Sequence, residues 1–368
     1  MKIAGVLLGT LLLTQLTVKA DELTGMVYPS DIGDGPAVTT FAEKYQINST
    51  RAAGDAYIDL LKYLLPAPNQ GEAGSCLYMA HTGNVEFWLN RIAKNENPAS
   101  EGATDISERY LMNISDSPIA DKIENHMTDS IYLFNLNNSK AAKNSDYRFT
   151  KGWYKTVNGQ MQKAISTDVD ASYDASYNWI NSLVDINISK LVTLPTFERE
   201  VLFKEATGNK WAINALPTDI VETIKQKLKE RQAPVIVVYN HYLVWHAVMI
   251  VGWDDQEPTN TCKFTTGFPK YAREEADKAK LAGNLERAKF LNGQAQKIED
   301  AMTAEGGCQP KGVFLVRDSI YASKTNTAMY DYDLSQTGDE ELYSEKVVKK
   351  EYQWLKRFGN HAYQIYVK

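Results

Sequence analysis

Residues 69–76 read Asn-Gln-Gly-Glu-Ala-Gly-Ser-Cys, and the fold prediction starts from this stretch. Gln70 places a side-chain amide six positions ahead of Cys76, and the Gly-Ser pair before the cysteine supplies a turn and a capping hydroxyl. Apolar residues then recur at helical spacing as far as Ile92. Backbone N–H groups at a helix N-terminus favour an anion, and a thiol must ionise to attack a carbonyl. The stretch therefore predicts a nucleophilic cysteine at the start of a helix; a small buried hydrophobe is the alternative for a lone cysteine.

A second stretch, His-Ala-Val-Met-Ile-Val-Gly-Trp at 246–253, predicts an apolar strand that begins with an imidazole. The chain has five histidines, so the others must be weighed against His246. His81 lies on the helix of Cys76, but at ~100° per residue it points about 140° away from the thiol. His241 would face the opposite side if it shared one strand with His246. The remaining two lack a matching context, and we expect His246 to be the base.

A third group must orient the imidazole, and the best candidate is Asp318. It ends an apolar run expected to form a strand over 312–318, and its carboxylate can accept from the ring N–H. Asp254 and Asp255 are the rivals. Asp254 lies eight residues beyond His246, roughly 26 Å away along an extended strand, so we expect the two acids to form a turn.

In order and spacing, these motifs resemble those of the papain family of cysteine peptidases, which carry Gln-Gly-x-x-Gly-Ser-Cys and His-Ala-Val-x-x-Val-Gly-aromatic stretches. A predicted helix at 220–231, followed by Pro234 and a strand at 235–239, matches the unit that precedes the family's histidine strand. The resemblance implies an α+β, papain-like two-lobed fold. A helical left lobe and a β-barrel-like right lobe would hold the active site in the cleft between them.

The same resemblance implies roles for four residues. Cys76 would be the nucleophile, His246 the base, Asp318 its orienting partner in place of the family's Asn, and Gln70 a donor to the oxyanion. The implied function is a secreted cysteine peptidase that acts on peptide or protein substrates through a thioester, with no cofactor. A transglutaminase-like acyl transferase is one alternative. A weak or inactive papain-like binding protein is the other, because Asp318 and Ile320 both depart from the family's Asn-Ser-Trp pattern.

The order of the segments predicts the domain organisation. Residues 1–20 resemble a signal peptide, with a short basic start and an apolar run too short to span a membrane. Residues 21–50 are expected to be an N-terminal extension or short pro-segment. The papain-like catalytic domain would then occupy 51–368, with a helical insert at about 263–307. We expect this insert to be a surface hairpin, with an exosite as the alternative.

The net charge and the number of cysteines limit the possible cellular compartments and binding partners of the protein. The net charge falls from −6 to −8 without the two lysines of the predicted signal peptide, which argues against a nucleic-acid partner. We expect a secreted, periplasmic or lysosome-like location. An odd number of cysteines in an exported chain leaves one thiol over, so we expect Cys262 to pair with Cys308 and Cys76 to stay free. Three buried free thiols are the alternative.

Overall fold

The computed structural model describes residues 56–67, 76–96, 98, 105–108, 140–144, 146, 154–157, 160–163, 191–204, 219–242, 244–259, 263–319, 342–344 and 346–368. The expected signal peptide and N-terminal extension lie outside these residues, as do Gln70, Cys262 and most of the expected helical left lobe between 97 and 218. Within the described residues, no helix has both the length and the apolar character needed to cross a bilayer.

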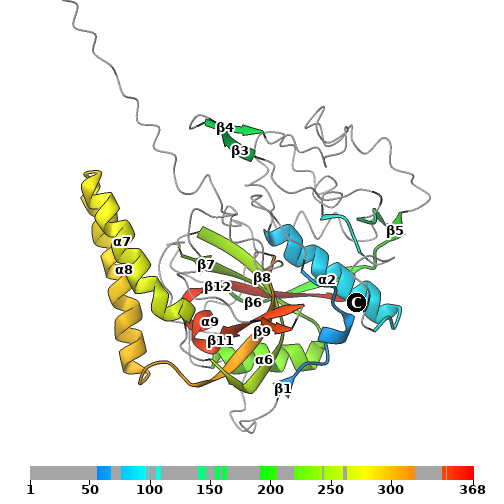
Figure 1. Ribbon diagram of the computed structural model, residues 1–368. Coiled ribbons are helices and arrows are strands. Elements are labelled where there is room, and N and C mark those ends of the chain that lie inside the picture. Colours follow the sequence, from blue (N-terminus) through cyan, green and yellow to red (C-terminus); the bar gives the residue numbers. More distant parts are fainter. Residues whose placement is uncertain are drawn as a thin grey trace, which may run out of the picture.

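The body of the protein is an eight-stranded sheet in which every pairing is antiparallel (Figure 1). The hydrophobic runs expected around His246 and Asp318 form two neighbouring strands in its middle. The strands in spatial order are β10 (Leu342–Ser344), β11 (Val347–Glu351), β9 (Lys311–Arg317), β8 (Val244–Pro258), β7 (Val235–His241), β12 (Gly359–Val367) and β6 (Phe197–Lys204), with β1 (Ala56–Tyr57) pairing with β8.

The sheet is open among the described strands, so the expected β-barrel-like right lobe is not confirmed. Its two ends are β10 and β6, and these are not paired with each other. The C-terminal strand β12 pairs with β7 on one side and β6 on the other, which extends the sheet sideways. Two short antiparallel pairs lie outside this sheet: β2 (Lys140–Ala141) with β5 (Val192–Thr193), and β3 (Tyr154–Val157) with β4 (Gln160–Lys163).

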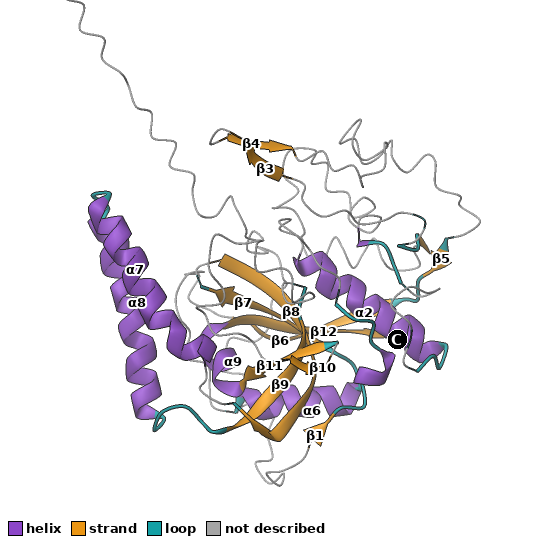
Figure 2. Ribbon diagram, in the orientation of Figure 1, coloured by secondary structure: helices purple, strands orange, loops and turns teal. Residues whose placement is uncertain are grey.

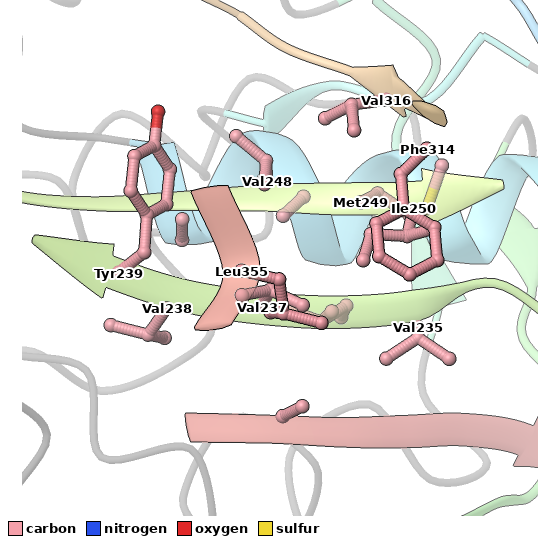
Figure 3. Packing of buried hydrophobic residues seen from close by; sticks show 14 of the residues in the cluster. Val235, Val237, Val238, Tyr239, Val248, Met249, Ile250, Phe314, Val316 and Leu355 are labelled. Carbon is pink, nitrogen blue, oxygen red and sulfur yellow. The ribbon is translucent and has the colours of Figure 1, made fainter. Parts of the chain in front are cut away.

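The core is densest around β7, where every residue is buried. A strand covered on both faces is apolar throughout rather than alternating, and the run Val-Ile-Val-Val at 235–238 has that pattern. Figure 3 shows Val237 and Val248 on the neighbouring strands β7 and β8, with Leu355 packed nearby. Because this layer is buried, the strand positions that carry the site are tightly fixed.

Helix α2 (Cys76–Ile92) packs along β8 and begins at Cys76, as the sequence predicts. Its side chains are buried on all sides from Cys76 to Trp88, so it is a central helix rather than a half-exposed one. Ile92 is 57% exposed, so the expected apolar stripe does not extend to that residue. A short 3-10 turn, η2 (Leu61–Tyr63), contacts α2.

Helices α6 (Ile220–Arg231) and α9 (Tyr352–Phe358) also pack on the sheet, and α6 has the bounds expected from its apolar spacing. Between β8 and β9 the chain forms a hairpin of two helices, α7 (Lys263–Leu281) and α8 (Leu285–Ala304). Gly283 turns the chain with a φ of 78°, and the side chain of Asn284 accepts from Arg287 N to cap α8. Figure 2 shows this hairpin projecting from the body on the side away from α2.

Candidate active site

His246 and Asp318 form a buried pair on neighbouring strands. His246 lies in β8, and Asp318 follows directly after the last residue of β9. The imidazole Nε2 lies 2.7 Å from Oδ1 of the carboxylate. The side chains are 2% and 0% exposed, so water does not compete for this hydrogen bond.

Cys76 approaches the same imidazole from α2. It is buried, it is a free thiol, and its side chain lies within hydrogen-bonding reach of His246. Since Nε2 is engaged by Asp318, Nδ1 is the ring nitrogen left for the thiol. The structure thus brings a thiol, an imidazole and a carboxylate, all expected from the sequence, into one chain of contacts.

The surroundings of His246 favour its protonated form. Burial acts to lower the pKa of His246, but the charge of Asp318 and the hydrogen bond to it, with further contributions from Cys76, raise the pKa from 6.5 to about 9. At neutral pH the ring is therefore an imidazolium held between a carboxylate and a thiol.

Arg317 connects the two elements that carry this site. Its guanidinium donates to the carbonyl oxygens of Leu65, Pro66 and Met79 at 3.1, 3.1 and 3.2 Å. Met79 is in α2, three residues after Cys76, and Arg317 itself precedes Asp318. One buried side chain thereby fixes the helix that begins at Cys76 against the strand that leads to Asp318.

The guanidinium also has a buried charged partner, Glu86 of α2, at 3.2 Å. The second oxygen of Glu86 accepts from the backbone N–H of Ile106 at 3.0 Å, which satisfies this carboxylate further. Gly83 leaves room for the arginine, because a Cβ at that position would overlap with Nη1 of Arg317. The sequence motifs give no sign of this network, since a buried arginine in a strand looks like any other charged residue.

The rival acids have other partners. Asp254 Oδ1 accepts from the backbone N–H groups of Gln256 and Glu257 at 2.9 and 3.1 Å, and the strand pairing is irregular between Asp254 and Pro258. Asp255 forms an ion pair with Lys225 at 2.6 Å. The expected turn is thus an irregularity inside β8.

Three other histidines are buried: His81, His241 and His361. His81 is buried, and its Nε2 lies 2.9 Å from the hydroxyl of Tyr363. His241 corrects our expectation that it faces away from His246. The two lie on separate strands joined by a tight turn at Tyr242, and their ring centroids are 5.6 Å apart.

Sequence reasoning missed Lys350, which lies behind Asp318. Its Nζ is 3.4 Å from Oδ2 of the carboxylate, the oxygen on the other side from His246. A lysine on a strand usually indicates a solvent-facing position, so only the flanking apolar residues could have pointed to burial. Within the described residues, no group of three His, Cys, Asp or Glu side chains is arranged to hold a metal ion.

The chain is similar to several solved structures. One is a clostridial cysteine protease after propeptide cleavage (14% identity, TM-score 0.40), with 85% of this chain and 58% of that one covered. Another is digestive procathepsin L2 from the larval midgut of Tenebrio molitor (11%, 0.44), with 94% and 78% covered. A third is a mite allergen from work on cross-reactivity between Blo t 1 and Der p 1 (12%, 0.39), with 91% and 79% covered.

No family model and no curated protein matches the chain. The chain spans 58% of the clostridial protease structure, and all three TM-scores are below 0.5. The function is therefore inferred from the residues of the site and their geometry.

Proposed function

We propose that the protein is a secreted, papain-like cysteine peptidase that cleaves peptide bonds through a thioester on Cys76. The observation that supports this most is the buried sequence of contacts from Cys76 through His246 to Asp318. A nucleophile, a base and a group that orients the base are the parts that acyl transfer by a thiol requires.

In the first half of the proposed reaction, the Cys76 thiolate attacks the carbonyl carbon of the scissile peptide bond. The tetrahedral oxyanion then collapses, the C–N bond breaks, and the imidazolium of His246 gives its proton to the leaving amine. The acyl group remains on Cys76 as a thioester.

In the second half, neutral His246 takes a proton from a water molecule that attacks the thioester carbonyl. Collapse of the second oxyanion releases the carboxylic acid and restores the thiolate–imidazolium pair. Asp318 keeps the imidazole in one orientation throughout, because its Oδ1 holds Nε2.

Gln70 is the proposed side-chain donor to the oxyanion, beside the backbone N–H of Cys76. Its place in the proposal comes from its six-residue spacing from the nucleophile and from the Gly71 that follows it. A positioned donor of this kind stabilises the charge that develops on the carbonyl oxygen in the transition state.

The test compares wild type with Cys76→Ala, His246→Ala and Gln70→Ala on unfolded protein and on a broad peptide library. The first two variants should show no turnover while keeping the far-UV circular dichroism of wild type. Gln70→Ala should lose about 2.7–4 kcal/mol of transition-state stabilisation, the usual effect of removing one oxyanion donor. Equal digestion by wild type and Cys76→Ala would refute the peptidase proposal, and peptide binding without turnover would favour an inactive binding protein.

A further inference from the structure

Lys350 is a buried lysine that the mechanism above does not use. It lies in β11, two residues after the buried Val348, so both side chains point to the same face of the strand. Its side chain is 1% exposed. An ammonium that leaves water loses several kcal/mol of solvation unless charges and hydrogen bonds replace the water, so its partners explain its position.

Those partners lie on three different elements. Nζ is 3.4 Å from Oδ2 of Asp318, beyond the end of β9, and it donates to the hydroxyl of Tyr239 in β7 at 3.3 Å. It also lies over two aromatic rings, 5.2 Å from the centroid of Tyr239 and 5.3 Å from that of Trp354 in α9. Figure 3 shows the Tyr239 ring standing off β7 with its hydroxyl at the free end. Cation–π contacts of this kind are strongest where water is excluded.

The hydrogen bond from Lys350 has a fixed direction, because an ammonium only donates and the Tyr239 oxygen must accept. The O–H of Tyr239 can then donate to Nδ1 of His241, 2.8 Å away. This requires a neutral His241. Burial, followed by the charges of His246 and Lys350, holds the pKa of His241 well below its usual value of 6.5. His246 and Lys350 are therefore two cations that contact the carboxylate of Asp318.

We propose that Lys350 is a positioning residue of the active site, acting through Asp318. Its ammonium holds Oδ2, so that Oδ1 stays directed at Nε2 of His246, and it supplies the positive charge that a carboxylate shielded from water needs. This inference rests on the proposed peptidase function. It goes beyond that function because the orientation of His246 then depends on the ionisation of a further group, Lys350. This lysine lies on β11, a strand that bears neither the nucleophile nor the base.

The dependence has a predicted pH signature. Burial, only partly opposed by Asp318 and Glu351, lowers the pKa of Lys350 from 10.5 to about 8. Above that pH the lysine is neutral and no longer holds the carboxylate by charge. Among the described residues, the titratable and charged groups near this position are Asp318 after β9, Tyr239 and His241 in β7, His246 in β8 and Glu351, the next residue of β11.

The first experiment measures kcat and KM from pH 5.5 to 10 for wild type, Lys350→Gln and Lys350→Met. Below pH 7 both variants should have kcat lowered about 10- to 100-fold with little change in KM, the usual range when a group that orients a functional histidine is removed. The ratio of wild-type to variant kcat should shrink toward one as the pH rises through about 8. A ratio that is independent of pH would assign Lys350 a packing role and overturn the proposal.

The second experiment is a double-mutant cycle with Asp318→Asn. An amide has no charge to balance, so replacing Lys350 should lower kcat less than about threefold in the Asp318→Asn background. Additive losses would contradict an action through Asp318. If Lys350→Met does not fold, Lys350→Gln decides both experiments, because its amide can still donate to the Tyr239 hydroxyl.

A third readout needs no turnover and separates this inference from the proposed function. In the NMR spectrum of labelled protein, the His246 ring signal should change in two stages, near pH 8 and near pH 9, in wild type and in one stage in Lys350→Gln. Two stages in a protein without peptidase activity would support the role of Lys350 and refute the peptidase. A single stage in an active wild-type protein would leave the peptidase in place and refute the role of Lys350.

Discussion

Two regions of the protein place their charged side chains in opposite ways. One is the site layer, the part of the sheet and of α2 that holds Cys76, His246 and Asp318, and the other is the α7–α8 hairpin. In the site layer the charged side chains of Arg317, Glu86, Lys350 and Asp318 are nearly fully buried, and each interacts with a residue on another element. In the hairpin the charges remain in water. Arg273 and Glu299, for example, form a 2.6 Å pair in which both side chains are 42% exposed.

This difference determines which substitutions of charged residues each region tolerates. An exposed ion pair contributes about 0–1 kcal/mol, because water and salt screen it. Removing one partner of a buried pair is costly, since it leaves an uncompensated charge away from water. The site layer therefore gains fixed geometry and becomes sensitive to substitution, whereas the hairpin depends on the contacts between its two helices.

The two regions meet at the base of the hairpin. Phe268 of α7 packs edge-on against Tyr242 and Phe358, with ring centroids 5.5 and 5.3 Å apart. Tyr242 is the residue with a φ of 49° in the turn between β7 and β8, four positions before His246. The base of the hairpin thus belongs structurally to the site layer, and only the distal part of the hairpin is independent of it.

The largest expected effect on stability is that of Arg317→Met. This change leaves Glu86 without its charged partner and removes the donors to the carbonyl oxygens of Leu65, Pro66 and Met79. The free energy of unfolding, measured by urea denaturation at pH 7, should fall by about 3–5 kcal/mol. Adding Glu86→Gln should recover part of the loss. A loss below about 1 kcal/mol would contradict the view that this pair joins α2 to β9.

A somewhat smaller loss is expected for Phe268→Ala, at the base of the hairpin. Phe268 is fully buried, and the change opens a cavity beside Tyr242 and Phe358. Denaturation should show a loss of about 3 kcal/mol, typical of truncating a buried aromatic ring. A loss of unfolding free energy below about 0.5 kcal/mol, the size expected for an exposed residue, would show that the base of the hairpin does not belong to the site layer.

A third prediction concerns the alkaline limit of kcat/KM. In the proposed mechanism activity needs the His246 imidazolium, so the activity that remains after the decline near pH 8 caused by Lys350 should be lost as the pH rises through about 9. Asp318→Asn removes the carboxylate that raises this pKa, so the limit should move to lower pH by about one unit, on the order of 1.4 kcal/mol.

Asp254→Ala is the control for this pH shift, since Asp254 Oδ1 accepts from the backbone N–H groups of Gln256 and Glu257. Its profile should match that of wild type. A larger change at Asp254 than at Asp318 would transfer the orienting role away from the carboxylate that contacts His246.

The smallest effect is expected at the tip of the hairpin. Leu281 is 90% exposed, so Leu281→Ser removes almost no buried surface. The unfolding free energy should change by less than about 0.5 kcal/mol, and kcat/KM should stay at the wild-type value. A marked loss of activity in this stable variant would indicate that the tip contacts substrate, which is the exosite alternative.

Much of the site layer follows from local sequence patterns. The strand of His246, the strand that leads to Asp318 and helix α6 each have a hydrophobic period that matches the observed element. The predicted orientation of His241 was wrong because nothing in the stretch Asn-His-Tyr-Leu-Val-Trp at 240–245 indicates a turn. Tyr242 adopts a positive φ there without the Gly or Asn that such turns usually have.

The buried charge network could not be predicted from local patterns. Arg317 and Lys350 lie in strands where sequence alone does not distinguish a buried charge from a solvated one, and their partners are 231 and 32 positions away in the chain. The expected β-barrel-like right lobe came from the family resemblance rather than from these residues. The long-range pairing of β12 with β7 and β6 brings the described sheet to its end at β6.

The most direct test of the central claim, that Cys76 is a nucleophile activated by His246, is covalent labelling with an epoxysuccinyl inhibitor followed by peptide mapping. The thiolate should open the epoxide, so the adduct should map to Cys76 in wild type and be nearly absent in His246→Ala at pH 6.5. Non-reducing digestion of the same sample should give the expected Cys262–Cys308 peptide. Labelling at another residue, equal labelling of both proteins, or a disulfide that contains Cys76 would contradict the account.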